Sequence, residues 1–120
     1  MKHNWEYKRL GEVCEILNGY AFKSELFQES GKPILRITNI QNDIVTTDNL
    51  VYCNLNDYKA DLTKFIVKPN NIVMALSGAT TGKVGLNKTN FEFLLNQRVA
   101  LFKNILISNQ YLFYALKNEG

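Results

Sequence analysis

Short apolar runs separated by turn residues dominate the hydrophobic pattern of this sequence. The run from Ile72 to Leu76 follows the turn Pro69-Asn70-Asn71 and is succeeded, after the loop from Ser77 to Gly82, by the segment from Lys83 to Leu86. Two β-forming runs joined by a glycine-bearing loop predict a β-hairpin. We expect this hairpin to lie at the centre of the fold.

Two other segments alternate apolar and polar residues. The segment from Ile34 to Ile40 places Arg36 and Thr38 between apolar neighbours, and the segment from Gln97 to Lys103 does the same with Arg98. A period of two is typical of a strand with one exposed face. We therefore expect two half-buried strands, with Arg36 and Thr38 on a shared exposed face.

Helical periodicity is clearest in two places. Apolar residues recur at spacings of three, four and three between Leu55 and Phe65, which predicts a short helix that Asn54 or Asn56 could cap. A last helix is expected after Ser108, which is a suitable N-cap residue. The apolar stripe of the first helix is expected in the core.

These elements, with a further strand from Val13 to Leu17, predict one domain over residues 1–120 of the α/β (mixed α+β) class. We expect a twisted, largely antiparallel sheet and a few short helices. The composition, with 46% hydrophobic residues, 2 Pro and 7 Gly, is that of a packed protein. Cys14 and Cys53 have no CxxC spacing, which favours reduced core thiols. No apolar run is long enough to span a bilayer, so a cytoplasmic protein is expected.

Charge is distributed unevenly along the chain. Residues 1–63 hold seven basic and nine acidic side chains, whereas residues 64–120 hold seven basic and two acidic, giving −2 and +5. No acidic residue lies between Asp61 and Glu92, and this stretch contains Lys64, Lys68, Lys83 and Lys88. Such a stretch could face phosphates or could be an ordinary solvated surface, and charge alone leaves both interpretations open.

The loop between the hairpin strands differs from a nucleotide-binding P-loop. Gly78 and Gly82 are four positions apart instead of five, and Val84 follows Lys83 where a hydroxyl should hold magnesium. What remains is a hydroxyl-rich tip that could approach phosphates or base edges. The alternative is a tight hairpin whose glycines serve the turn alone.

Catalytic constellations are weak in this sequence. Asp48 with Asp57 and Lys59 is the nearest match to a metal-dependent nuclease motif, but residues two apart on the expected helix do not share a face. His3 is the only histidine and has no evident partner. We therefore expect no enzyme activity, no metal and no cofactor.

Several side chains are of types suited to reading DNA bases, since Arg can bind guanine and Asn or Gln can bind adenine. They are Arg36, Asn39, Gln41, Asn96, Gln97 and Arg98. The amides of Asn96 and Gln97 could instead satisfy backbone groups at a bend. The residues predicted to bind DNA are Arg36, Asn39, Ser77, Thr80, Thr81, Lys83 and Arg98.

Five sequence blocks, in this order and spacing, resemble the target-recognition domain of the specificity subunit of a Type I restriction-modification system. They are Trp5 to Val13 with Asn18 to Phe22, Gly31 to Ile40, Pro69 to Gly78 with Thr81 to Val84, Asn96-Gln97-Arg98, and Gln110 to Leu116. Asn70 and Asn71 stand where the family often has Gly-Asp, a tolerable change because Asn also accepts left-handed geometry.

The resemblance implies a non-catalytic module that reads one half of a bipartite target in double-stranded DNA. Its partners would be methylation subunits, which bring S-adenosylmethionine chemistry, and restriction subunits, which bring ATP-driven translocation. The chain ends before the family's spacer helices, so a truncated product or half-subunit fragment is expected, and self-association stays open. The alternatives are a structural remnant that docks on a methylation subunit without reading DNA, and a small metal-dependent nuclease.

Overall fold

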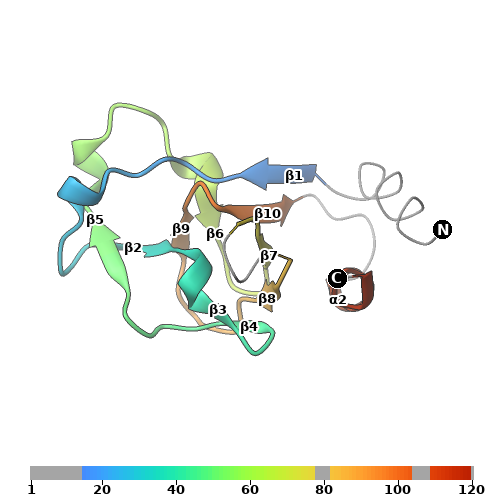
Figure 1. Cartoon of the computed structure of the whole chain (residues 1–120). Coiled ribbons are helices and arrows are strands. Elements are labelled where there is room, and N and C mark those ends of the chain that lie inside the picture. Colours follow the sequence, from blue (N-terminus) through green and yellow to red (C-terminus); the bar gives the residue numbers. More distant parts are fainter. Residues whose placement is uncertain (1–14, 78–81, 104–108, 120) are drawn as a thin grey trace.

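The computed structural model describes residues 15–77, 82–103 and 109–119 (Figure 1). The strands are β1 (Glu15–Asn18), β2 (Lys32–Leu35), β3 (Ile40–Gln41), β4 (Ile44–Val45), β5 (Val51–Cys53), β6 (Ile66–Val67), β7 (Ile72–Ala75), β8 (Val84–Leu86), β9 (Phe93–Leu95) and β10 (Val99–Lys103). The helices are the 3₁₀ turns η1 (Ser24–Leu26), η2 (Ile37–Asn39), η3 (Leu55–Asp57) and η4 (Thr63–Phe65), and the α-helix α2 (Asn109–Glu119).

The strands form two sheets. One has the order β1-β10-β7-β8-β4-β3 and the other the order β5-β2-β9-β6. Among the described strands, the pairs β2–β9 and β4–β8 are parallel and the other pairs are antiparallel. The predicted α/β class with largely antiparallel pairing is confirmed, although the strands divide between two sheets.

The core has two parts, one on each face of the six-stranded sheet. Val73, Ala75 and Leu101 point toward the four-stranded sheet and pack in one cluster with residues of β2 and β9. Ile72 and Phe102 point the other way and pack against α2. The order of layers is therefore four-stranded sheet, six-stranded sheet and α2, with β5 and α2 toward opposite ends of the molecule in Figure 1.

Burial on both faces explains one incorrect expectation. The strand predicted from Gln97 to Lys103 is present as β10, but it has no exposed face, because Val99, Ala100, Leu101 and Phe102 are all buried. A strand covered on both sides needs no alternation of apolar and polar residues. The hairpin predicted from Ile72 to Leu86 is confirmed by the antiparallel register of β7 and β8.

The strand predicted from Ile34 to Ile40 is wrong beyond Leu35. β2 ends there, and the chain turns through η2 before the short β3 begins. The side chain of Asn39 accepts a hydrogen bond from the backbone N–H of Arg36, 3.1 Å away, and so closes the turn. Such a side-chain bond competes with the strand ladder for the backbone donor.

The helix predicted between Leu55 and Phe65 is also wrong, because two 3₁₀ turns, η3 and η4, take its place. The Asn54 side chain accepts from the N–H of Asn56 at 3.0 Å, so its predicted capping role is confirmed for a shorter element. The Asp61 side chain accepts from the N–H of Thr63 at 3.0 Å. Leu62 and Phe65 are buried as expected, whereas Leu55 is 44% exposed.

The predicted last helix is confirmed as α2, in which Leu112 and Leu116 are buried against β7, β8 and β10. The expected N-cap, Ser108, lies outside the described residues. The strand predicted from Val13 to Leu17 is confirmed over its described part by β1, which pairs with β10.

Candidate nucleic-acid interface

Backbone hydrogen bonds bring three of the predicted site residues together at one end of the six-stranded sheet. The N–H of Ala75 donates to the carbonyl of Lys83, and the N–H of Leu76 donates to the carbonyl of Arg98, both at 2.9 Å. Ser77 follows directly. We call Leu76, Ser77, Lys83 and Arg98 the loop end of the sheet, because they border the loop that joins β7 to β8.

The cationic side chains of the loop end reach solvent. Lys83 and Arg98 are exposed, and neither side chain makes a hydrogen bond or ion pair within the described residues. The Ser77 hydroxyl is buried, and no described atom bonds it. Leu76 is 37% exposed. Two cations, a hydroxyl and an apolar side chain thus border one loop without internal partners among the residues described.

Two glycines shape this end of the sheet. Gly82 has a φ of +88°, in the left-handed region that glycine adopts without strain, and its N–H donates to the carbonyl of Ala75 at 2.8 Å. Gly19 follows β1 and lies against the backbone of Asn96, where a Cβ atom would overlap the carbonyl group. Only glycine allows this close approach of the two chain segments.

Of the candidates in this turn, Asn39 lies in the interior of the fold and Arg36 is half-buried, whereas Thr38 is exposed as predicted. Asn39 has no exposed surface, and its side-chain nitrogen donates to the carbonyl of Asp48 at 2.9 Å. The Arg36 guanidinium donates from Nη2 to the carbonyl of Asn49 at 2.6 Å. Because the polar groups of Asn39 are bonded to backbone, this residue is no longer a candidate for base contact.

The remaining sequence candidates divide into three groups. Thr80 and Thr81 lie outside the described residues. Asn96 accepts at Oδ1 from the N–H of Gln97, 2.8 Å away, as the alternative of a bend-stabilising amide predicted. The side chain of Gln41 donates to the carbonyl of Thr38 at 2.9 Å. Sequence reasoning placed Leu76 in a core strand and missed its exposure, for which the uniformly apolar run gives no signal.

Comparison with known proteins identifies the family. Residues 2–119 match the family described as the Type I restriction modification DNA specificity domain. The chain belongs to this family. The resemblance predicted from the five sequence blocks is thereby confirmed.

Individual relatives agree with this assignment. The specificity domain is 37% identical over 118 residues to the Type I restriction enzyme EcoAI specificity subunit of Escherichia coli, covering 93% of this chain and 20% of that protein. It is 33% identical over 122 residues to the MjaVIII specificity subunit of Methanocaldococcus jannaschii, covering 97% of this chain and 28% of that one. The chain thus spans a fifth to somewhat over a quarter of these curated relatives.

Solved structures share the fold. The HsdS subunit from Thermoanaerobacter tengcongensis superposes with a TM-score of 0.66 at 16% identity, covering 89% of this chain and 25% of that one. A solved structure concerned with complex assembly and conformational transition of the type I R-M system superposes with a TM-score of 0.67 at 18% identity. The match covers 90% of this chain and 26% of that one. At these identities the likeness concerns the fold alone.

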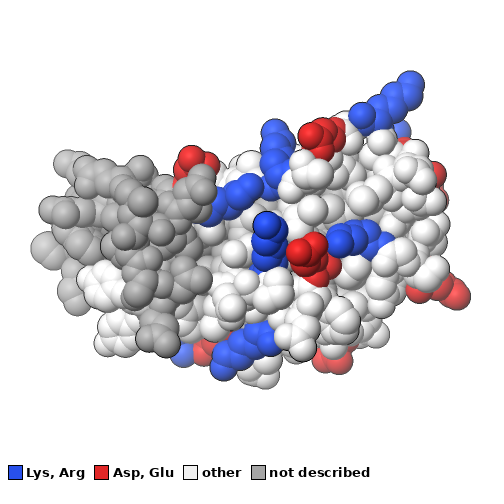
Figure 2. Space-filling view, turned by 180° about the vertical axis from the view of Figure 1, so that it is seen from behind, with Lys and Arg blue, Asp and Glu red and all other residues white. Residues whose placement is uncertain are grey.

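The lysines of the second half do not form one surface on the specificity domain. Lys83 is at the loop end, whereas Lys68 and Lys88 lie near Asn87, at the opposite end of the β7–β8 hairpin, where the Asn87 side chain donates to the carbonyl of Lys68. On the face seen in Figure 2, lysine and arginine side chains are spread out with acidic side chains among them. The charge asymmetry along the sequence therefore does not become a continuous basic patch on the described part of this face.

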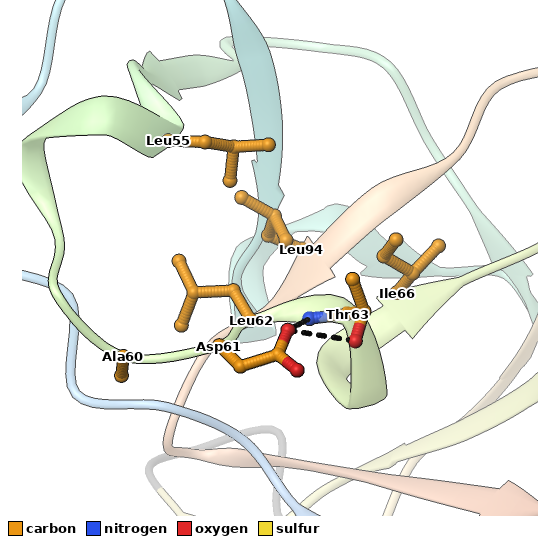
Figure 3. Close-up of a pocket in the computed structure, with 7 residues that line it drawn as sticks. All are labelled: Leu55, Ala60, Asp61, Leu62, Thr63, Ile66 and Leu94. Atoms are coloured by element: carbon orange, nitrogen blue, oxygen red, sulfur yellow. Dashed lines mark hydrogen bonds between the residues drawn. The ribbon is translucent and has the colours of Figure 1, made fainter.

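A pocket of about 200 Å³ lies elsewhere, in a part of the specificity domain formed by η3, η4 and β9. Its lining consists of Leu55, Ala60, Asp61, Leu62, Thr63, Ile66 and Leu94. Figure 3 shows the Asp61 carboxylate turned toward Thr63, whose backbone N–H and hydroxyl both donate to it. The Thr63 N–H, followed by the hydroxyl, lowers the pKa of Asp61 below its ordinary value. The lining is otherwise mostly apolar, so it lacks the converging polar groups that orient a small ligand.

The described residues offer no support for metal chemistry. Asp57 lies in η3 and Lys59 follows it, so the helix that was expected to keep them apart is absent. Nevertheless, no group of three or more His, Cys, Asp or Glu side chains that could hold a metal occurs in the described ranges. Cys53 is buried, and burial, followed by the charge of Asp57, raises the pKa of its thiol, as suits an unreactive core cysteine. His3 and Cys14 lie outside the described residues.

No helix in the described ranges is both long and apolar enough to cross a membrane.

Proposed function

We propose that this specificity domain binds double-stranded DNA through the loop end of its six-stranded sheet and reads one half of a bipartite target. The observation that supports the proposal is the position of Lys83, Arg98 and Ser77 at one end of the sheet, beside one hairpin loop, in a chain of the DNA specificity family. Ser77 and Lys83 flank the loop between β7 and β8, and Arg98 directly precedes β10. Their side chains are unused within the described part of the fold.

Each part of the loop end suits a different DNA group. Lys83 presents a flexible ammonium group that can bind phosphate as a point charge. Arg98 presents a planar guanidinium group, which can bond the O6 and N7 atoms of guanine at once. The Ser77 hydroxyl is buried without a described partner, so it could donate to phosphate or base only if DNA binding exposes it. Because β7 and β8 both pair with further strands of the six-stranded sheet, the loop between them is the part of the hairpin proposed to approach the groove. Thr80 and Thr81, at the tip, stay predicted contacts.

The partner assignments rest on the relatives. Because the matched proteins are named specificity subunits of Type I restriction enzymes, we propose that this chain directs methylation and restriction subunits to DNA and contributes no catalytic residue itself. This chain would then recognise the DNA, and the methylation and restriction subunits would carry out the chemistry. A cytoplasmic location follows from that assignment.

The test is selection of the purified chain against a random pool of duplex DNA, with sequencing of the bound fraction at two salt concentrations. The proposal predicts enrichment of a short asymmetric motif that survives moderate salt, because base contacts persist when phosphate contacts are screened. Binding without a motif, or no binding, would contradict independent reading of DNA. Co-purification with a methylation subunit in that case would favour the structural remnant.

A further inference from the structure

We infer that Leu76 is a specificity-determining residue, which contacts the methyl group of a thymine beside the guanine that Arg98 binds. The inference rests on the proposed function and deepens it, since it assigns two adjacent bases to two neighbouring side chains. It starts from an exposed apolar side chain at the loop end of a sheet whose other residues are largely buried.

Strand pairing places Leu76 and Arg98 opposite one another. Ala75 is the partner of Val99 in the β7–β10 register, and the bond from the Leu76 N–H to the Arg98 carbonyl extends the pairing by one residue. Residues directly opposite in an antiparallel pair have Cβ atoms roughly 5 Å apart. Leu76 and Arg98 are therefore nearest neighbours across the two strands.

The two side chains also share a face of the sheet. In β7, Ile72 and Met74 pack toward α2, so the alternation puts Leu76 on the same side. In β10, Phe102 packs toward α2, and Arg98 is an even number of residues away from it. Lys83, in contrast, pairs with Ala75 and lies on the other face. The α2 side of the loop end therefore presents one guanidinium and one apolar side chain, side by side.

This pair matches the chemistry of the major groove. Thymine is the base that presents a methyl group there, and apolar side chains contact it, whereas Arg is suited to guanine. Successive base pairs are separated by roughly 3.4 Å along the duplex, which neighbouring cross-strand side chains can span. A lone exposed Leu needs no explanation in general. Here it lies beside an exposed Arg with no internal partner in the described part of the chain, where a DNA-binding role for that Arg is already proposed.

The experiment begins with the motif selected from the random duplex pool and replaces each thymine in turn by deoxyuridine, which removes the methyl group alone. For the unmodified chain, we expect one thymine next to a guanine whose replacement weakens binding about fourfold, the value of one buried methyl group. For Leu76→Ala, the same replacement should change affinity by less than about 1.5-fold. Leu55→Ala is the matched control, because Leu55 is a similarly exposed leucine, at 44%, away from the loop end.

The outcomes separate this inference from the proposed function. If the chain selects no motif, the proposed function fails and the inference fails with it. A motif that contains no thymine beside guanine would overturn the inference while leaving DNA reading intact, and so would equal sensitivity of Leu76→Ala and the unmodified chain to deoxyuridine. Thermal unfolding of both variants verifies that each is folded, and Leu76→Ser supplies a second test if Leu76→Ala is not.

Discussion

Polar side chains at the two ends of the β7–β8 hairpin differ in burial and in hydrogen bonding. At the end away from the loop, Asn87 is fully buried, and its side-chain nitrogen donates to the carbonyls of Lys68 and Phe91, each at 3.1 Å. Its side-chain oxygen accepts from the N–H and the hydroxyl of Thr89. At the loop end, Lys83 and Arg98 are exposed, and neither has a side-chain partner in the described part of the chain.

Hydrogen bonding distinguishes structural from functional polar residues at the two ends of this hairpin. A buried amide with all its hydrogen bonds made fixes the surrounding loops and has no capacity left for a ligand. An exposed cation with no internal partner adds little to stability and remains available for binding. Substitutions at the first kind of site should alter stability, and those at the second should alter DNA binding where the cation lies at the loop end.

The largest expected effect is on the support of the loop end. Gly19→Ala would force a Cβ atom into the carbonyl of Asn96, so we expect a loss of about 3 kcal/mol or more in the free energy of unfolding. Gly82→Ala is the control, because no described atom beyond its chain neighbours lies within 4 Å of the position that a Cβ atom would take there. Its cost is the positive φ alone, about 1 kcal/mol. Denaturant titration of both variants measures the two losses in the free energy of unfolding. Equal losses for Gly19→Ala and Gly82→Ala would contradict this prediction.

Asn87→Ala should destabilise the protein by about 2 kcal/mol, because it removes the donor to the carbonyls of Lys68 and Phe91 and the acceptor for Thr89 from a fully buried position. DNA affinity of the folded fraction should stay within about twofold. Asn90→Ala, an exposed amide in the same loop, should change stability by less than about 0.5 kcal/mol. Loss of DNA affinity by folded Asn87→Ala would remove the distinction between the two ends.

Arg98→Lys tests the role of one loop-end side chain, since it keeps the charge and removes the planar guanidinium group. If Arg98 binds guanine, discrimination between the selected site and a site with that guanine replaced should fall about tenfold, with little change in the salt dependence of binding. Competition binding with the two duplexes measures the ratio. An unchanged ratio would mean that Arg98 contacts phosphate alone.

Asp61 is an intermediate case, exposed but bonded twice by Thr63, and it should give the smallest effect. Its pKa is lowered below the ordinary 3.8 by those bonds, so the folded state favours the carboxylate and the added stability is present above that pH. It is lost as the pH falls through the lowered pKa. Asp61→Ala should therefore be slightly less stable at neutral pH, and the gap should close in strong acid. Glu29→Ala is the control. A stability difference between Asp61→Ala and the unmodified chain that did not change with pH would contradict the stabilising role of the Asp61–Thr63 bonds.

The sequence predicted the elements that depend on local pattern. Asn70, whose φ of 73° is left-handed as anticipated, lies in the predicted turn before β7. The predicted bounds of β7, β8 and β10 differ from the observed ones by at most two residues at either end. Periodicity failed between Leu55 and Phe65, because Asn54 and Asp61 bond the backbone two residues further on and favour short turns over a helix. Side-chain burial on both faces of a sheet depends on layers that no single segment encodes.

The candidate site was predicted only in part, because residue type does not say where the fold places a side chain. Lys83 and Arg98 lie at the same end of the sheet because β7 pairs with both β8 and β10. Lys83 was predicted from its place after the hairpin loop and Arg98 from its residue type. Asn39 has an equally suitable side chain, but its turn directs the amide into the core. Residue type therefore indicates what a side chain could bind, whereas the turn or strand that holds it decides whether it can reach a ligand.

Charge reversal at each end of the same hairpin tests most directly whether DNA binds at the loop end. Duplex DNA binding is measured as a function of salt for the unmodified chain, Lys83→Glu and Lys88→Glu, both lysines being exposed. We expect Lys83→Glu to lower affinity at least about tenfold at low salt and to reduce the salt slope by about 1, while Lys88→Glu changes affinity less than about threefold. Equal losses for the two variants, or no loss for Lys83→Glu, would contradict the assignment of DNA to the loop end.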